Sequence, residues 1–184
     1  MTARIQPVEV ASAEGRTQEL FGQIQKRLGK VPNMMKTMAH SPALLEGYLA
    51  LSNALAQGVL PAQVREQLSL AVSQENDCEY CVSAHSMLGK LAGLKPDQLV
   101  AARRGQADDE KTQALLSFAL DVVDNRGDVS DEALEAVKDA GASDAEVAEI
   151  VGFVALNTLT NYFNQLAQTE IDFPRVSLQL ESVA

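Results

Sequence analysis

The apolar residues of this chain recur mainly at intervals of three and four positions, which is the spacing of one face of an α-helix. Leu20, Ile24 and Leu28 form such a face within residues 17–28. No stretch alternates with the period of two that indicates a half-buried strand. The methionines of residues 34–38 are expected to fill the core rather than to bind a ligand. The pattern therefore predicts an all-α protein.

Residues that favour helix starts and stops divide this pattern into about eight helices. Ser41 before Pro42 is typical of a helix start, and Gly58 offers a left-handed residue that would end that helix. Ser143 and Glu146 have the spacing of a capping box and open a long last helix. We expect helices at residues 17–28, 42–57, 62–75, 78 to 89 or 93, 96–104, 111–125, 131–140 and 144–169.

The chemistry of the chain is concentrated at residues 77–85, which hold both cysteines and one of the two histidines. If this stretch opens a helix, Cys78, Cys81 and His85 share one face of its first turns, because they are spaced by three and then four residues. Asp77 is then the expected N-cap. A thiol in the first turn also lies at the positive end of the helix dipole, which favours the thiolate.

Composition and charge exclude several classes of protein. The net charge of −10 argues against nucleic acid as a partner, since phosphate binding needs a basic surface. The longest apolar stretch, residues 150–159, is interrupted by Asn157 and preceded by Glu149, so we expect no membrane span. Residues 1–7 lack the apolar run of a signal peptide. We therefore expect a cytoplasmic, reducing location, where a CxxC is usually catalytic or metal-binding.

Four interpretations other than thiol catalysis can be weighed for the two cysteines. A c-type haem site requires His directly after the second cysteine, where this chain has Val82. A thioredoxin domain is disfavoured because no strand precedes the motif. A purely structural pair leaves the nearby imidazole and helix start unexplained. A zinc site stays open, with Cys78, Cys81 and His85 as ligands and Glu66 as a fourth.

Thiol–disulfide or peroxidatic chemistry accounts for all three side chains together. His85, one turn beyond Cys81, is positioned to bind that sulfur or to carry its proton. Cys78 lies within bridging reach, so a sulfenic acid on one sulfur can condense with the other thiol. Glu66 lies among the inward-facing residues of the preceding helix. It is either an edge-of-core carboxylate paired with a neighbour such as Arg65, or part of the same site.

These residues resemble the core of the AhpD-like alkylhydroperoxidases, which belong to the carboxymuconolactone decarboxylase superfamily. The resemblance rests on residues 61–66 (PAQVRE), then the CEYCVSAH sequence of residues 78–85, with Gly93 beyond. The glutamate precedes the C-x-x-C-x-x-x-H motif by twelve residues. Residues 161–164 (NYFN) and 172–174 (DFP) resemble the branch called peroxidase-related proteins.

The resemblance implies a role for each residue of the motif. Cys81 would be the peroxidatic cysteine, and Cys78, nearer the surface, would be the resolving cysteine that meets the reductant. Glu66 and His85 would form a proton relay through water. Tyr80 stands where the best-known members have histidine, and a phenol with a pKa of about 10 cannot relay protons near neutral pH. Tyr80 is therefore expected to be accessory, and the relay to be shorter.

The resemblance also implies an architecture and partners. We expect residues 1–59 to be an N-terminal helical extension and residues 60–184 to hold the core and the C-terminal helices, in one compact unit. The expected substrate is a hydroperoxide, the expected reductant is a dithiol such as a lipoylated protein, and no metal or other cofactor is expected. The family forms trimers or hexamers. The alternatives are a decarboxylase-like enzyme acting on a small lactone acid and a non-catalytic helical oligomer.

Overall fold

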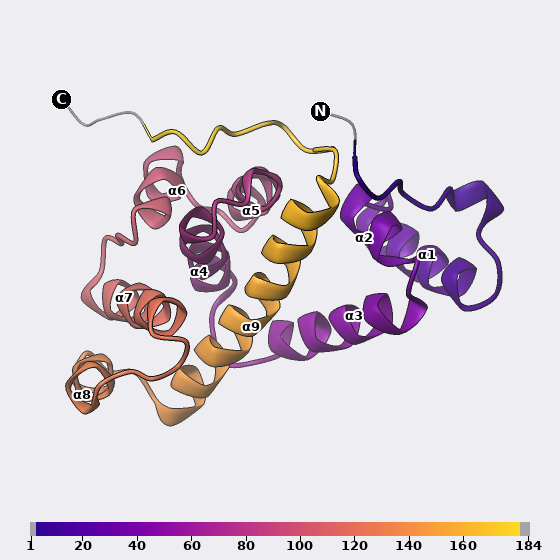
Figure 1. Ribbon diagram of the computed structural model, residues 1–184. Coiled ribbons are helices and arrows are strands. Elements are labelled where there is room, and N and C mark those ends of the chain that lie inside the picture. The colour runs from indigo at the N-terminus through magenta and orange to yellow at the C-terminus, as the bar shows by residue number, and fades with distance from the viewer. Residues whose placement is uncertain (1–2, 181–184) are drawn as a thin grey trace.

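The computed structural model describes residues 3–180, which contain nine α-helices, one 3-10 helix and no strand (Figure 1). The predicted all-α class is confirmed. The short Met-rich segment forms a helix of its own, beyond the eight expected. Residues 1–2, which begin the predicted N-terminal extension, and residues 181–184, which end the predicted core unit, lie outside the described residues. The helices are α1 (Gly15–Leu28), α2 (Asn33–Met38), α3 (Pro42–Ala56), α4 (Ala62–Glu75), α5 (Glu79–Leu91), α6 (Pro96–Arg103), α7 (Glu110–Asp124), α8 (Asp131–Asp139) and α9 (Asp144–Ala167).

The main core forms around α4, which contacts α5, α6, α7 and α9. Every residue of α4 from 67 to 73 is buried, so this part of the helix is enclosed on all sides. Leu68, Leu116 and Ile150 are fully buried and join α4, α7 and α9 into one hydrophobic cluster. In Figure 1, α9 runs diagonally through the middle of the molecule, with α4–α8 on one side and α1–α3 on the other.

A second core joins the N-terminal helices to the motif region. Met34, Met35 and Met38 are buried in this cluster together with Phe21, so the prediction that the methionines fill the core is confirmed. The same cluster includes Cys78, Tyr80 and Cys81. The cysteine motif is therefore enclosed by segments from both ends of the chain. The division of the chain at residue 59 stays a prediction.

Most predicted helix starts are confirmed by their capping contacts. Ser143 and Glu146 form the expected reciprocal capping box at the start of α9. The prediction that Gly58 ends α3 in a left-handed conformation is wrong, because the helix ends at Ala56 and Gly58 has no positive φ. A Cβ atom at Gly58 would lie 2.2 Å from Oε1 of Glu149. A side chain at position 58 would therefore displace that carboxylate.

The segment after α9, residues 170–180, is an extended strap that crosses the α4–α6 side of the molecule (yellow in Figure 1). The backbone N–H of Val176 donates to Oγ of Ser83 at 3.0 Å. Arg103 Nη2 donates to the carbonyl of Ser177 at 2.6 Å. The strap is thus held by side chains of the core helices. Within residues 3–180, no helix is both long and apolar enough to cross a membrane.

Candidate active site

The turn between α4 and α5 places the first cysteine at the start of a helix. Asp77 has a φ of +53°, so it makes the left-handed turn between the two helices. The prediction that Asp77 is the N-cap is wrong, because this turn moves the cap one residue on, to Cys78. The Sγ atom of Cys78 accepts the backbone N–H of Cys81 at 3.3 Å. A cysteine sulfur therefore occupies the anion-favouring position of the helix terminus.

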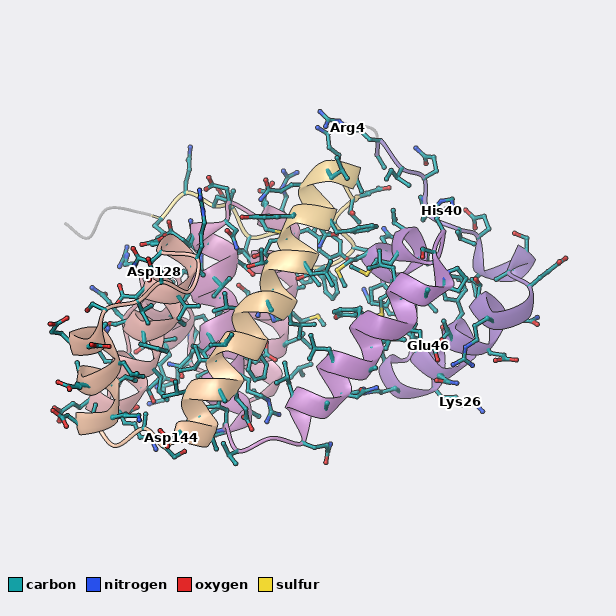
Figure 2. All side chains as sticks on the ribbon, turned by 60° about the horizontal axis from the view of Figure 1, so that its bottom comes forward. Arg4, Lys26, His40, Glu46, Asp128 and Asp144 are labelled. Atoms are coloured by element: carbon teal, nitrogen blue, oxygen red, sulfur yellow. A yellow bond between two sulfur atoms is a disulfide. The ribbon has the colours of Figure 1, made fainter. Side chains whose placement is uncertain are left out.

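Cys78 and Cys81 form a disulfide, with their Cα atoms 5.3 Å apart. The expectation that Cys78 lies nearer the surface is wrong, since Cys78 is 1% exposed and Cys81 is 3% exposed. Both residues pack in the second core, between the N-terminal helices and α9. Figure 2 shows sulfur atoms in this region. A reductant can reach this disulfide only if a neighbouring segment moves.

Glu66 and His85 are brought together across the α4–α5 interface. The Nδ1 atom of His85 lies 2.8 Å from Oε2 of Glu66, and each side chain is about one-fifth exposed (22% and 21%). Arg65, the other expected partner of Glu66, instead donates to the carbonyl of Leu60 at 2.7 Å. Within residues 3–180, no hydrogen bond joins His85 directly to either sulfur. The Glu66–His85 pair therefore has no hydrogen bond to the disulfide in this state, although His85 follows Cys81 by about one turn of α5.

Asn164 of α9 contacts the disulfide directly, and sequence reasoning gave this residue no role. Its Nδ2 atom donates to Sγ of Cys81 at 3.4 Å. Asn157 and Asn161, on the same face of α9, donate to Ser69 and Ser73 of α4 at 3.2 Å each. The signal in the sequence was the placement of three asparagines at intervals of four and three in an otherwise apolar helix.

Tyr80 anchors the strap rather than lying free beside the sulfurs. Its hydroxyl donates to Oδ1 of Asp172 at 2.8 Å and accepts the backbone N–H of Met34 at 3.2 Å. The ring packs edge-on against Phe173, with 5.5 Å between centroids. Burial above all raises the pKa of this phenol far above its usual range. Tyr80 is therefore held neutral, as a link between α5, α2 and the strap.

The strap has a further contact on its outer side. The Nζ atom of Lys30 lies 3.2 Å from Oδ2 of Asp172 and 4.3 Å from the centre of the Phe173 ring. Arg175 forms a two-pronged ion pair with Glu79, in the first turn of α5. That ion pair lowers the pKa of Glu79. The strap is thus also held by ion pairs at Asp172 and Arg175.

A second phenol, Tyr48 of α3, packs against the cluster that contains both cysteines. Burial, and secondly the negative charge of Glu66, raise the pKa of Tyr48 to about 12. Spacing along the chain does not predict that Tyr48 and Glu66 are neighbours, because they belong to different helices. The influence of Glu66 on Tyr48 indicates that the carboxylate and the phenol belong to one electrostatic environment.

The other histidine lies away from this site. Figure 2 shows His40 on the outside of the molecule, and its Nε2 atom lies 2.8 Å from the carbonyl of Gln6. His40 thus connects the N-terminal segment to the turn that follows α2. Among residues 3–180, no three His, Cys, Asp or Glu side chains are grouped so that they could hold a metal ion.

These features define a class of protein: an all-α fold with a CxxC disulfide at a helix start, next to a Glu–His pair from two packed helices. Residues 42–125 match the carboxymuconolactone decarboxylase family. A peroxidase-related protein from Ralstonia eutropha JMP134, described as an alkylhydroperoxidase AhpD core, is 27% identical. Its crystal structure superposes over 92% of each chain with a TM-score of 0.82.

Two other proteins are similar to this chain. An alkyl hydroperoxide reductase of Mycobacterium tuberculosis is 28% identical over 104 residues, which are 56% of this chain and 30% of that protein. The chain thus spans less than a third of that curated relative. A debrominase crystallised with 2,3,4-tribromopyrrole shares the fold, with a TM-score of 0.77 over 94% of this chain at 20% identity. Residues 42–125 thus resemble the carboxymuconolactone decarboxylase family, and residues 3–180 have the AhpD-like fold, as the motif predicted.

Proposed function

We propose that this protein is a thiol-dependent peroxidase that reduces hydroperoxides with Cys78 and Cys81 and is itself reduced by an external dithiol. The observation that carries the proposal is the Cys78–Cys81 disulfide at the start of α5, together with the Glu66–His85 pair that joins the same helix to α4. The names of the Mycobacterium and Ralstonia relatives support the same chemistry. The enzyme is proposed to work in the reducing cytoplasm, where a dithiol donor is available.

The proposed reaction starts from the reduced pair. The thiolate of Cys81 attacks the terminal, proton-bearing oxygen of the hydroperoxide, and the O–O bond breaks. The departing alkoxide takes a proton and leaves as the alcohol, while Cys81 becomes a sulfenic acid. The thiol of Cys78 then attacks that sulfur and water leaves, which forms the disulfide. An external dithiol reduces the disulfide by exchange and is itself oxidised, so two electrons pass from the dithiol to the peroxide.

The Glu66–His85 pair is proposed to move the protons of this cycle. A neutral imidazole whose Nδ1–H donates to Glu66 presents Nε2 as an acceptor. His85 can then take the proton of the Cys81 thiol and return it to the leaving alkoxide. Because His85 does not contact a sulfur in the disulfide state, we place a water molecule between them. Tyr80 takes no part in proton transfer, since its phenol is held neutral by burial.

We also propose that the protein works as a homo-oligomer, a trimer or a hexamer. The outward face of α9 carries Val151, Tyr162 and Leu166, which are 51%, 60% and 64% exposed. These positions recur with the period of the helix and form an apolar stripe that a second copy can cover. The reductant is proposed to be a dithiol such as a protein-bound lipoyl group, which is narrow enough to enter a partly opened site.

The test is consumption of hydrogen peroxide and tert-butyl hydroperoxide by the purified protein, supplied with dihydrolipoamide, glutathione or thioredoxin. Cys81→Ser should abolish turnover, and Cys78→Ser should stop after one equivalent of peroxide. Glu66→Gln should reduce the rate by roughly 100-fold, the usual contribution of general acid–base catalysis. Glu75→Gln, an exposed carboxylate on the same helix, is the matched control and should not change the rate.

Two results would overturn the proposal. The first is intact thiols without peroxide turnover under any of the three reductants. The second is decarboxylation of a small lactone acid that survives in the Cys78→Ser, Cys81→Ser double variant. That activity would assign the site to the chemistry for which the matched family is named. The oligomer is tested separately by light scattering, where Tyr162→Glu should produce monomers.

A further inference from the structure

Asn164 has one hydrogen-bonded atom and one unpartnered atom beside the disulfide. The residue is 3% exposed, and its Nδ2 atom donates to Sγ of Cys81 at 3.4 Å. Its Oδ1 atom is buried and has no partner; within residues 3–180 only Oγ1 of Thr169 shares that condition. Burying an amide oxygen without a donor costs about 1–3 kcal/mol. Such a residue contributes less to stability than an apolar one of the same shape, which points to a role in the site.

We propose that Asn164 positions both reactants: its Nδ2–H group holds the Cys81 sulfur as a thiolate, and its Oδ1 atom accepts the O–H of the incoming hydroperoxide. This inference rests on the proposed peroxidase function and adds a residue and a substrate requirement to it. The two atoms belong to one planar amide. A peroxide oxygen held by Oδ1 therefore lies next to the sulfur held by Nδ2, as the attack requires.

The donor half of the amide acts most strongly on the reduced protein. A hydrogen bond to an ionised acceptor is roughly twice as strong as one to a neutral acceptor. The Nδ2–H group therefore favours the thiolate of Cys81 over both its thiol and the disulfide. Cys78 receives its hydrogen bond from the backbone of α5 instead. Asn164 is thus a side chain that distinguishes the two sulfurs, and it selects Cys81 as the attacking one.

The acceptor half limits the substrate. A hydroperoxide carries an O–H group that can donate to Oδ1, whereas a dialkyl peroxide carries none. Since Oδ1 has no protein donor to give up, this hydrogen bond is gained when the hydroperoxide binds. The substrate class is therefore hydrogen peroxide and organic hydroperoxides. In the transition state the amide holds the attacked oxygen while the Glu66–His85 pair supplies the proton to the departing one.

Other ionisable groups near Cys81 must be kept constant in the test. They come from α3, α4, α5 and the strap, and none of them is altered by substitution of Asn164. They are Tyr48, Glu66, Tyr80, His85 and Asp172, with Cys78 replaced by serine in every protein compared. A difference between variants then reports the amide alone.

The first measurement is the pH dependence of Cys81 alkylation by iodoacetamide in the Cys78→Ser protein, without any peroxide. Asn164→Leu, which is similar in size and apolar, should raise the midpoint by roughly one pH unit, the equivalent of a charge-assisted hydrogen bond. Asn164→Asp should raise it further, since a carboxylate repels the thiolate. Asn157→Leu, on the same face of α9 but bonded to Ser69, is the matched control and should leave the midpoint unchanged.

The second measurement is the rate of tert-butyl hydroperoxide reduction at a pH above all the midpoints, where every variant is fully thiolate. Asn164→Leu should remain about tenfold slower than the parent there, because the acceptor for the O–H group is gone. Equal midpoints for Asn164→Leu, Asn164→Asp and the parent would overturn the donor role, and equal rates at high pH would overturn the acceptor role. A shifted midpoint in a protein that never consumes peroxide would refute the peroxidase proposal while leaving the Cys81 contact intact. Having two variants covers the case in which one does not fold.

Discussion

Removal of the Asp172 carboxylate should loosen the strap and open the disulfide. The carboxylate accepts the Tyr80 hydroxyl at 2.8 Å and the backbone N–H of Asn33 at 3.3 Å, and it pairs with Lys30 at 3.2 Å. A hydrogen bond to a charged partner contributes about 1.5–3 kcal/mol. The Lys30 pair adds less than about 1 kcal/mol because the lysine is well exposed. Asp172→Ala should therefore cost roughly 2–3 kcal/mol.

This loss has a second consequence for the disulfide. Ile171 and Phe173 of the strap pack against the cluster that encloses both sulfurs. If a reductant enters when the strap lifts, the rate of reduction follows the population of the open state. A loss of 2 kcal/mol raises that population by about 30-fold. Reduction by dithiothreitol should accelerate by a similar factor.

The assays are urea denaturation and the rate of disulfide reduction, followed by labelling of the released thiols. Asp128→Ala, an exposed carboxylate in the turn between α7 and α8, is the control and should change neither quantity. Tyr80→Phe should resemble Asp172→Ala, and the double variant should cost about 1.5 kcal/mol less than the sum. Loss of stability without faster reduction would refute the claim that the strap controls access.

Three further predictions concern stability. Gly58→Ala should push aside the Glu149 carboxylate, which accepts the backbone N–H groups of Val59 and Leu60 at 2.7 and 3.0 Å, and urea denaturation should show a loss of about 1–3 kcal/mol. Glu149→Ala should cost a similar amount and add little to Gly58→Ala, so additive losses would contradict this account. Asp109→Ala should cost about 1 kcal/mol at pH 7, because Asp109 caps α7 through the backbone N–H of Thr112. That hydrogen bond lowers the pKa of Asp109 in the folded protein. The stabilisation by the ionised carboxylate is therefore present above the usual Asp pKa and is lost as the pH falls through the folded pKa. In acid, Asp109→Ala and the parent should become equally stable. The pKa of Tyr48 is raised from 10.0 to about 12 in the folded protein. The contribution of the neutral phenol to the free energy of unfolding is therefore complete below pH 10 and is lost as the pH rises toward 12. Tyr48→Phe should lose less stability than the parent between those pH values, and an equal loss in both would contradict the assignment.

Local sequence rules were sufficient for the motif and for every α-helix of residues 3–180 except the short α2. The period of the apolar residues and the caps at Ser41 and Ser143 predicted the helix starts, because these depend on neighbours within one turn. The spacing of Cys78 and Cys81 predicted a bridgeable pair for the same reason. These local rules failed at Gly58 and Asp77. At Gly58 the local conformation depends on the distant Glu149 carboxylate, and at Asp77 a left-handed turn moves the helix cap to the next residue.

Tertiary structure alone determined which distant side chains surround the Cys78–Cys81 pair. Asn164 of α9 lies 83 residues after Cys81 in the sequence, yet it contacts the Cys81 sulfur. Asp172 contacts Tyr80 over a similar separation. The strap that carries Asp172 has no regular spacing of apolar residues from which its position could be predicted. The burial of Cys78 arises in the same way, from the packing of the N-terminal helices. Spacing along the chain determines contacts within a helix, whereas contacts between helices depend on how their faces pack.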